Sequence, residues 1–417
     1  MALQAAKNRR DSRRRPSLNR LLAATAALLL SLSLAACDQA ASDTASGQES
    51  LKAWPASQPG EDPPPAPAPV EAVIGNLDAL AALLPTATLA ALFDPVAFGT
   101  TVRDLSDPAV LAFHVRATLA QLSGQCQLAS PYHCYGYPGY NAGVALVPVR
   151  FKNRYGTELY GEIVLPGRGA LPPRAGAYPV ILALEGLATN TAVYRWWHQL
   201  FADAGYLVFA FDFVGQGKSQ DAVTGDPGNT IEDAQDALSY LLEQSPVRAA
   251  LDASRIGVIG HSQGAITTLG LQAVEPRLKA AVAAAPISER SAPFAANPIP
   301  VMIQTGDHDG PVAPIPFLNP AVVRPIYEKL AGDRALIVAE ASTHAQHTSY
   351  PVLPSAQWGL EIAGRYSLAW MDYQLRGDRA ALEVLRGGHP HLSYLWDSEL
   401  RIAGETSSYR GAGPLPQ

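Results

Sequence analysis

The sequence is poor in cysteine, in charge and in long hydrophobic runs. Its 417 residues include 3 cysteines, and 16% of them are charged while 48% are hydrophobic. Such a chain is too apolar to be a disordered protein and is long enough to bury one large core. Its apolar run at residues 21–34 covers only 14 residues, which is too short for an ordinary membrane-spanning helix. There is also no internal repeat, so a repeat architecture is not indicated.

The short apolar run has the context of an export signal. It follows a basic segment that holds seven of the 31 Lys and Arg residues, and it ends in Leu34-Ala35-Ala36-Cys37. This order is typical of a signal peptide, and small residues before a cysteine resemble the bacterial lipobox, in which the cysteine is acylated. We therefore predict a signal peptide over residues 1–36 and a lipid anchor at Cys37. The anchor would hold the exported protein on a membrane of the cell envelope, on the periplasmic or cell-surface side. The alternative is a signal cleaved nearby, with Cys37 incidental.

The other cysteines and the remaining charge limit the possible partners. Cys126 and Cys134 are the only cysteines after Cys37, and in an exported chain such a pair predicts one disulfide. Two free thiols or a weak metal site are the alternative. Without residues 1–36 the formal charge is 24 − 36 = −12. An acidic surface repels phosphate backbones, so a nucleic-acid partner is not expected.

Composition divides the exported part of the chain into four regions. Residues 37–70 are rich in Pro and Ala and predict an extended tether. Residues 71–143 carry apolar helical patches and predict a small helical accessory region. Residues 144–400 are expected to form the catalytic domain, and residues 401–417 a C-terminal tail.

The catalytic region has the pattern of an α/β fold. Residues 144–151 and 159–165 predict an antiparallel hairpin, because alternating runs flank a turn-rich segment. Later apolar runs are separated by helical stretches, which is typical of a parallel sheet with helices on both faces. These strands are expected at residues 180–184, 207–211, 256–259, 280–284, 301–304 and 335–338.

The segment Gly260-His261-Ser262-Gln263-Gly264 predicts a nucleophile. It lies between an expected strand and an expected helix, where a sharp turn projects the serine and requires glycines on both sides. The helix that follows directs its amide groups toward a developing oxyanion. We therefore predict that Ser262 is a catalytic nucleophile.

A serine nucleophile needs a base and an orienting acid, which follow it in the chain on this type of fold. After the strand at residues 301–304 come Asp307 and Asp309, and we favour Asp309 because it lies three residues after Gly306. After the strand at residues 335–338 come His344 and His347. We favour His344 because it is nearer the end of the strand, with Asp307 and His347 as alternates.

These motifs resemble those of the α/β-hydrolase superfamily over Val144 to Leu385, most closely its dienelactone-hydrolase-like and cutinase/polyesterase-like esterases. The segments 211–219 and 366–371 also carry the resemblance. It implies an α/β-hydrolase fold and an oxyanion hole formed by the backbone amides of Gln263 and Leu187. Glu185 stands where this superfamily often has His, so the oxyanion loop departs from the common pattern. Glu185 is expected to be a buried carboxylate that supports the loop, or alternatively a group that reads a polar part of the substrate.

The function expected from these residues is hydrolysis of a carboxylic ester through an acyl-enzyme, without a metal or cofactor. The alternatives are a serine peptidase or amidase, or a non-catalytic binding lipoprotein. A metallohydrolase is a weaker rival, because a consecutive Asp-His-Asp rarely directs three side chains at one point. Its ligands would come from Asp307, His308, Asp309, His344 and His347. The aromatic residues Tyr194, Trp196 and Trp197 are expected in the core, with the alternative that one of them faces the acyl site.

Overall fold

The computed structural model describes residues 144–168, 176, 178–187, 189–286, 299–307, 309, 320–340, 342, 344–348 and 358–411. The predictions for the signal peptide, Cys37, the tether, the accessory region and the Cys126–Cys134 disulfide lie outside these residues.

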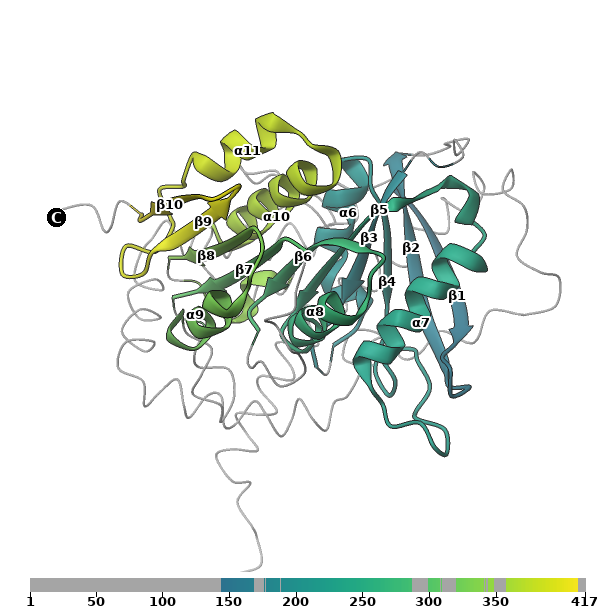
Figure 1. Cartoon of the computed structure of the whole chain (residues 1–417). Coiled ribbons are helices and arrows are strands. Elements are labelled where there is room, and N and C mark those ends of the chain that lie inside the picture. The colour runs from purple at the N-terminus through teal and green to yellow at the C-terminus, as the bar shows by residue number, and fades with distance from the viewer. Residues whose placement is uncertain are drawn as a thin grey trace, which may run out of the picture.

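Within the described residues, ten strands form one mixed sheet in the order β1-β2-β4-β3-β5-β6-β7-β8-β9-β10 (Figure 1). Its centre, from β4 to β8, is parallel. Antiparallel pairs lie on both sides, where β1 and β2 precede β4 and where β9 and β10 follow β8. The strands are β1 (Val144–Lys152), β2 (Glu158–Arg168), β3 (Tyr178–Leu184), β4 (Leu207–Phe211), β5 (Leu251–His261), β6 (Leu278–Ala284), β7 (Val301–Gly306), β8 (Arg334–Ala339), β9 (Ser398–Ile402) and β10 (Glu405–Tyr409).

Helices cover both faces of the sheet, as expected for parallel strands that are apolar along their whole length. The helices α7, α8 and α9 contribute to the hydrophobic core on one face, and α6, α10 and α11 contribute to the core on the other (Figure 1). The α-helices are α6 (Arg195–Asp203), α7 (Thr230–Glu243), α8 (Gln263–Val274), α9 (Pro320–Lys329), α10 (Gly359–Arg376) and α11 (Arg379–Arg386). The short 3-10 helices are η4 (Thr191–Tyr194), η5 (Arg248–Ala250) and η7 (His344–His347). This large mixed sheet with its helices agrees with an α/β-hydrolase-like fold.

The strand order brings several loops to one edge of the sheet. Strand β3 lies between β4 and β5, so the chain continues first to one side of β3 and then to the other. Sites on open α/β sheets form at such a reversal, beyond the carboxyl ends of the strands. The loops after β3, β5, β7 and β8 leave the parallel strands at this same edge.

The C-terminal part of the sheet extends further than expected. The predicted boundary between catalytic domain and tail, at residue 400, falls inside β9, and β10 adds residues 405–409 to the sheet. The prediction of a tail from residue 401 is therefore wrong for these residues. Strand β10 is a partly exposed edge strand with the sequence Glu-Thr-Ser-Ser-Tyr, so it lacks the apolar run by which the inner strands were recognised.

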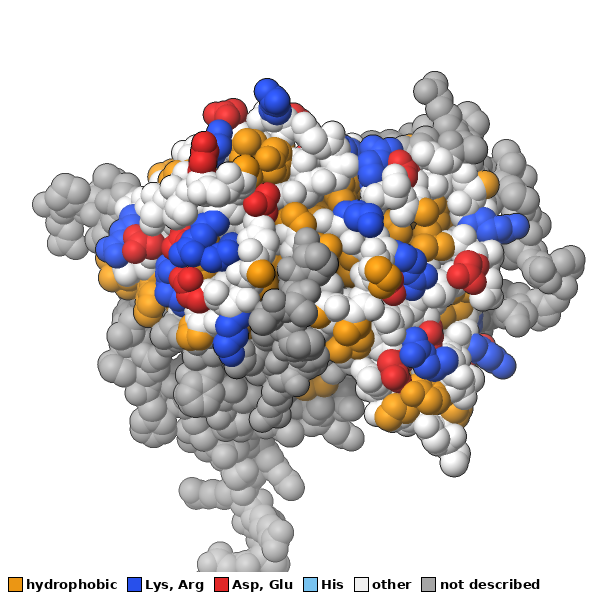
Figure 2. Space-filling model, viewed as in Figure 1, with side chains coloured by type: hydrophobic (Ala, Val, Ile, Leu, Met, Phe, Trp, Pro, Cys, Tyr) orange, Lys and Arg blue, Asp and Glu red, His pale blue; other side chains and the backbone are white. Residues whose placement is uncertain are grey.

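The surface seen in Figure 2 mixes charges of both signs. Side chains of Lys and Arg lie among those of Asp and Glu, with apolar patches between them. In the part of the chain that the structure describes, no helix is both long and apolar enough to cross a membrane.

Candidate active site

The turn between β5 and α8 holds Ser262 in an unusual backbone conformation. Strand β5 ends at His261, α8 begins at Gln263, and Ser262 between them has φ 55° and ψ −114°. A positive φ at a residue with a side chain costs about 1–3 kcal/mol and occurs mainly where the surrounding structure enforces it. The Ser262 N–H donates to the carbonyl of Ala284 at 2.9 Å, which fixes the turn against the end of β6.

The two glycines of the motif are needed because backbones meet at this turn. A Cβ atom on Gly260 would lie 2.3 Å from the carbonyl oxygen of Gly264. A Cβ atom on Gly264 would lie 2.3 Å from the carbonyl oxygen of Leu184, at the end of β3. Any side chain at either position would displace the backbone, so Gly-x-Ser-x-Gly is a packing requirement of this strand–turn–helix unit.

The loops after β7 and β8 bring Asp309 and His344 together. The Nδ1 atom of His344 lies 2.8 Å from Oδ1 of Asp309, and the hydroxyl of Thr305 donates to Oδ2 of Asp309 at 3.0 Å. Asp309 is fully buried, and burial raises the pKa of its carboxyl group, although His344 and the Thr305 hydroxyl oppose the rise. The loops cross so closely that a Cβ atom on Gly306 would lie 1.8 Å from the carbonyl oxygen of Ser342.

The alternate residues Asp307 and His347 lie in surroundings that differ from those of Asp309 and His344. Asp307 continues the backbone pairing of β7, because its N–H donates to the carbonyl of Ala339. His347 is fully buried, and its ring centroid lies 5.2 Å from that of His261 and 6.0 Å from that of Trp197. Burial, together with the nearby His344, lowers the pKa of His347 to about 3. His308 lies outside the described residues.

His261 joins the loop of His344 to the turn of Ser262. Its Nε2 atom lies 3.0 Å from the backbone carbonyl oxygen of His344, and the two ring centroids are 4.6 Å apart. The loop after β3 approaches from the other side, since a Cβ atom built on Gly186 would lie 3.5 Å from Cβ of Ser262. Loops that follow β3, β5 and β8 therefore meet around Ser262.

Glu185 supports the loop after β3 from inside the protein. It is buried, and its Oε1 accepts hydrogen bonds from the Phe213 N–H at 2.9 Å and from Nε2 of Gln216 at 3.1 Å. Burial and the neighbouring Asp212 raise the pKa of Glu185 well above its ordinary value. Leu187, two residues further on, is 50% exposed. The position of Glu185 agrees with a supporting role and not with a group that faces a substrate.

Of the aromatic residues after this loop, Trp196 and Trp197 pack in the core, whereas Tyr194 also forms polar contacts next to Ser262. Trp196 and Trp197 are buried, their rings stack at 5.5 Å, and both belong to the core as expected. Tyr194 is also buried, but its hydroxyl accepts from the Gly186 N–H at 3.1 Å and lies 2.9 Å from Nδ1 of His261. Neither this polar role nor the bridging role of His261 was predicted from the sequence.

Among the described residues, no group of three or more His, Cys, Asp or Glu side chains is arranged to hold a metal ion.

The catalytic region of the chain matches a known protein family. Residues 161–390 match the family described as "PETase: PET hydrolase-like", which is more than half of the 417 residues. The chain belongs to the PET hydrolase-like family. The matched segment includes Ser262, Asp309 and His344, and also Glu185 and Leu187 of the loop after β3.

Individual relatives agree with this assignment. The chain is 26% identical over 248 residues to cutinase 1 of Thermobifida cellulosilytica, which covers 58% of this chain and 83% of that protein. It is 27% identical over 267 residues to cutinase 2 of the same organism, covering 63% of this chain and 88% of that one. A bis(hydroxyethyl) terephthalate hydrolase of Streptomyces coelicolor is 26% identical over 233 residues, covering 52% of this chain and 67% of that one. The chain is thus a carboxylic ester hydrolase.

Proposed function

We propose that the protein hydrolyses esters through an acyl-enzyme on Ser262, with His344 as general base and Asp309 as the residue that orients it. The observation that carries this proposal is the 2.8 Å contact between Nδ1 of His344 and Oδ1 of Asp309, next to the turn of Ser262. A carboxylate there accepts the Nδ1 proton, which leaves Nε2 of His344 to take the proton of the serine hydroxyl.

The proposed reaction has two steps. Ser262 Oγ attacks the ester carbonyl while His344 takes its proton, and His344 then returns that proton to the departing alcohol. Water, activated by the same histidine, attacks the acyl-enzyme and releases the acid. Asp309 keeps the imidazole in one tautomer and stabilises the charge that it gains during each step.

The oxyanion hole is proposed to consist of the backbone N–H groups of Gln263 and Leu187. Gln263 is the first residue of α8, so its N–H has no acceptor within the helix and lies at the positive end of the helix dipole. The Gly186 N–H donates to Tyr194, which leaves Leu187 as the next amide of that loop. Each such donor typically stabilises the transition state by ~3 kcal/mol.

The proposed substrates are esters with apolar acyl groups, including aromatic ones. Leu187 is 50% exposed and follows Gly186, which lies against Ser262, so an apolar side chain borders the proposed site. Relatives carry the names cutinase and bis(hydroxyethyl) terephthalate hydrolase. These names support bulky esters over small acetates as the substrates of this chain.

We further propose export and lipid anchoring through Cys37, with a disulfide between Cys126 and Cys134. The support is the sequence pattern alone. Incorporation of labelled palmitate into the full chain, but not into Cys37→Ser, is expected, and equal labelling of both would contradict the anchor.

Ester turnover tests the proposed function. Wild type, Ser262→Ala and Ser254→Ala are compared on p-nitrophenyl esters from acetate to decanoate and on bis(2-hydroxyethyl) terephthalate. Ser254 is a matched control, since it lies on the same strand β5 and its side chain bonds to Asp252. We expect Ser254→Ala to match wild type and Ser262→Ala to lose turnover of every ester. Turnover by Ser262→Ala at the wild-type rate would exclude the proposed nucleophile.

A further inference from the structure

A line of hydrogen bonds runs behind Ser262 from the loop after β3 to the loop after β8. The Gly186 N–H bonds to the hydroxyl oxygen of Tyr194 at 3.1 Å, and that oxygen lies 2.9 Å from Nδ1 of His261. On the other side of the same ring, Nε2 lies 3.0 Å from the backbone carbonyl oxygen of His344. The line therefore connects the proposed oxyanion loop to the proposed general base.

The chemistry of the two ends fixes the direction of every bond in the line. A backbone N–H can only donate, so the Tyr194 oxygen accepts from Gly186. A carbonyl oxygen can only accept, so Nε2 of His261 carries the proton and donates it to His344. In the neutral ring Nδ1 is then an acceptor, so the Tyr194 hydroxyl donates to it. A doubly protonated ring would reverse this bond, because Nδ1 would have to donate to Tyr194.

The surroundings favour this neutral arrangement. Tyr194 and His261 are both buried. Burial, with His344 and His347 nearby, lowers the pKa of His261 well below its ordinary value, and burial raises the pKa of the Tyr194 hydroxyl. Neither group changes its charge near neutral pH, so the line is a fixed set of four polar groups.

The sheet alone does not set the distance between these two loops. Strands β5, β6 and β7 lie between β3 and β8. His261 ends β5, and its ring spans from Tyr194 on one side to the backbone of His344 on the other. Two side chains thus hold the spacing of loops that leave strands four positions apart in the sheet order.

We propose that Tyr194 and His261 are positioning residues that hold the Gly186-Leu187 loop and His344 in register across Ser262. This inference rests on the proposed function, because Ser262 and His344 are the catalytic groups of that proposal. Neither Tyr194 nor His261 is assigned a contact with the substrate. Displacement of a reacting group by about 1 Å can reduce a rate ~100-fold, so loss of the line is expected to lower kcat more than it changes KM.

Tyr194→Phe tests the inference, with Tyr206→Phe as its matched control. Tyr206 is fully buried, and its hydroxyl donates to Asp372 at 2.8 Å, so the control also removes a buried tyrosine hydroxyl. With p-nitrophenyl butyrate we expect Tyr194→Phe to lower kcat about 10- to 100-fold and to leave KM within about threefold. Tyr206→Phe is expected to keep the kcat of wild type.

A double-mutant cycle tests whether Tyr194 and His261 act as one unit on kcat. His261→Gln removes the ring that spans from Tyr194 to His344, although its amide still carries a donor and an acceptor. If the line acts as a unit, adding Tyr194→Phe to His261→Gln lowers kcat by no more than about threefold, since coupled residues are not additive. Multiplication of the two single effects would contradict the inference, even where one variant is less stable.

The outcomes separate the inference from the function on which it rests. Wild-type kcat in Tyr194→Phe, with turnover that still depends on Ser262, would overturn the positioning role and leave the proposed function intact. A wild type that does not depend on Ser262 would overturn both. Equal losses in Tyr194→Phe and Tyr206→Phe would show a general effect of removing a buried hydroxyl and would also overturn the inference.

Discussion

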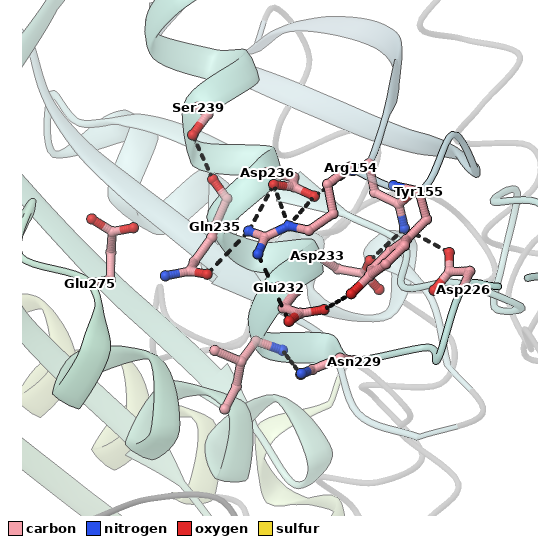
Figure 3. Close-up of polar contacts among 12 residues, drawn as sticks. Arg154, Tyr155, Asp226, Asn229, Glu232, Asp233, Gln235, Asp236, Ser239 and Glu275 are labelled. Carbon is pink, nitrogen blue, oxygen red and sulfur yellow. Dashed lines mark hydrogen bonds and ion pairs between the residues drawn. The ribbon is translucent and has the colours of Figure 1, made fainter.

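Two polar networks of this protein differ in burial and in charge. The line from Gly186 through Tyr194 and His261 to His344 is buried and consists of neutral groups. The second network lies where the β1–β2 turn meets α7, and charged side chains are at its centre (Figure 3). Both contain well-formed hydrogen bonds, so the number of bonds does not distinguish them.

Arg154 is the centre of the surface network. It is directed at α7, where its guanidinium bonds to both carboxylate oxygens of Asp236 and forms an ion pair with Glu232 (Figure 3). The hydroxyl of Tyr155 donates to Glu232 at 2.7 Å. The Arg154 side chain is 40% exposed, so water can replace these partners if they are lost.

The difference in exposure determines how much a polar contact contributes to stability. An exposed ion pair typically contributes only ~0.2–1 kcal/mol, because water and salt screen it. A buried donor or acceptor that loses its partner costs ~1–3 kcal/mol, because no water replaces the partner. Substitutions around Ser262 should therefore have large effects, and comparable substitutions in the surface network should have small ones.

The largest effect is expected from Asp309→Asn. An amide at this position no longer accepts the Nδ1 proton from His344 as a carboxylate does, so the histidine loses its productive tautomer. We expect kcat to fall about 1,000- to 10,000-fold with little change in KM. The matched control is Asp307→Asn, two residues earlier in the same loop, which should keep kcat within about fivefold of wild type. The reverse pattern would assign the acid to Asp307.

An intermediate effect is expected from the buried, neutral His198 on α6. Burial lowers its pKa to about 4 from 6.5, so the unfolded chain binds a proton first as pH falls from 6.5 to 4. Stability present above pH 6.5 is thus lost through this window, and His198 accounts for about 2 kcal/mol of the loss between pH 7.5 and 5. The free energy of unfolding is measured in denaturant at pH 7.5 and at pH 5. Between these pH values, His198→Leu and His198→Gln should each lose about 2 kcal/mol less stability than wild type. An unchanged pH dependence in both variants would contradict it.

The smallest effect is expected from Arg154→Ala in the surface network. Unfolding in denaturant should show a loss of less than about 1 kcal/mol that shrinks further at high salt, with kcat unchanged.

Arg195→Ala is the matched contrast to Arg154→Ala, because its partner Glu162 is buried and accepts from Arg195 at 2.8 Å. Loss of that arginine leaves a buried charge and should cost ~3–5 kcal/mol. Equal costs for the two arginines would refute the comparison.

The inner strands and the turn that holds Ser262 could be predicted from the sequence. Continuous apolar runs mark β3 to β8, and Gly260 and Gly264 are required by direct contact between backbones. The choice between His344 and His347 depended on an argument about chain position. In the structure Nδ1 of His344 contacts Asp309, and the ring of His347 lies beside that of Trp197.

Other features had no signal in the sequence. Strand β10 is polar and lies at the edge of the sheet, so its pattern does not differ from that of a tail. The contact of Tyr194 with Gly186 arises because η4 (Thr191–Tyr194) returns the chain to the loop that it has just left. Neither spacing nor hydrophobic periodicity predicts such a return, and aromatic residues at this point are ordinarily core.

The role of Ser262 as nucleophile is tested by locating the adduct of a fluorophosphonate probe, with mass spectrometry of the labelled, proteolysed protein. We expect one adduct, on the peptide that contains Ser262, with no adduct in Ser262→Ala and slow labelling of Asp309→Asn. An adduct on a different serine, or ester turnover by a wild type that the probe does not label, would contradict it.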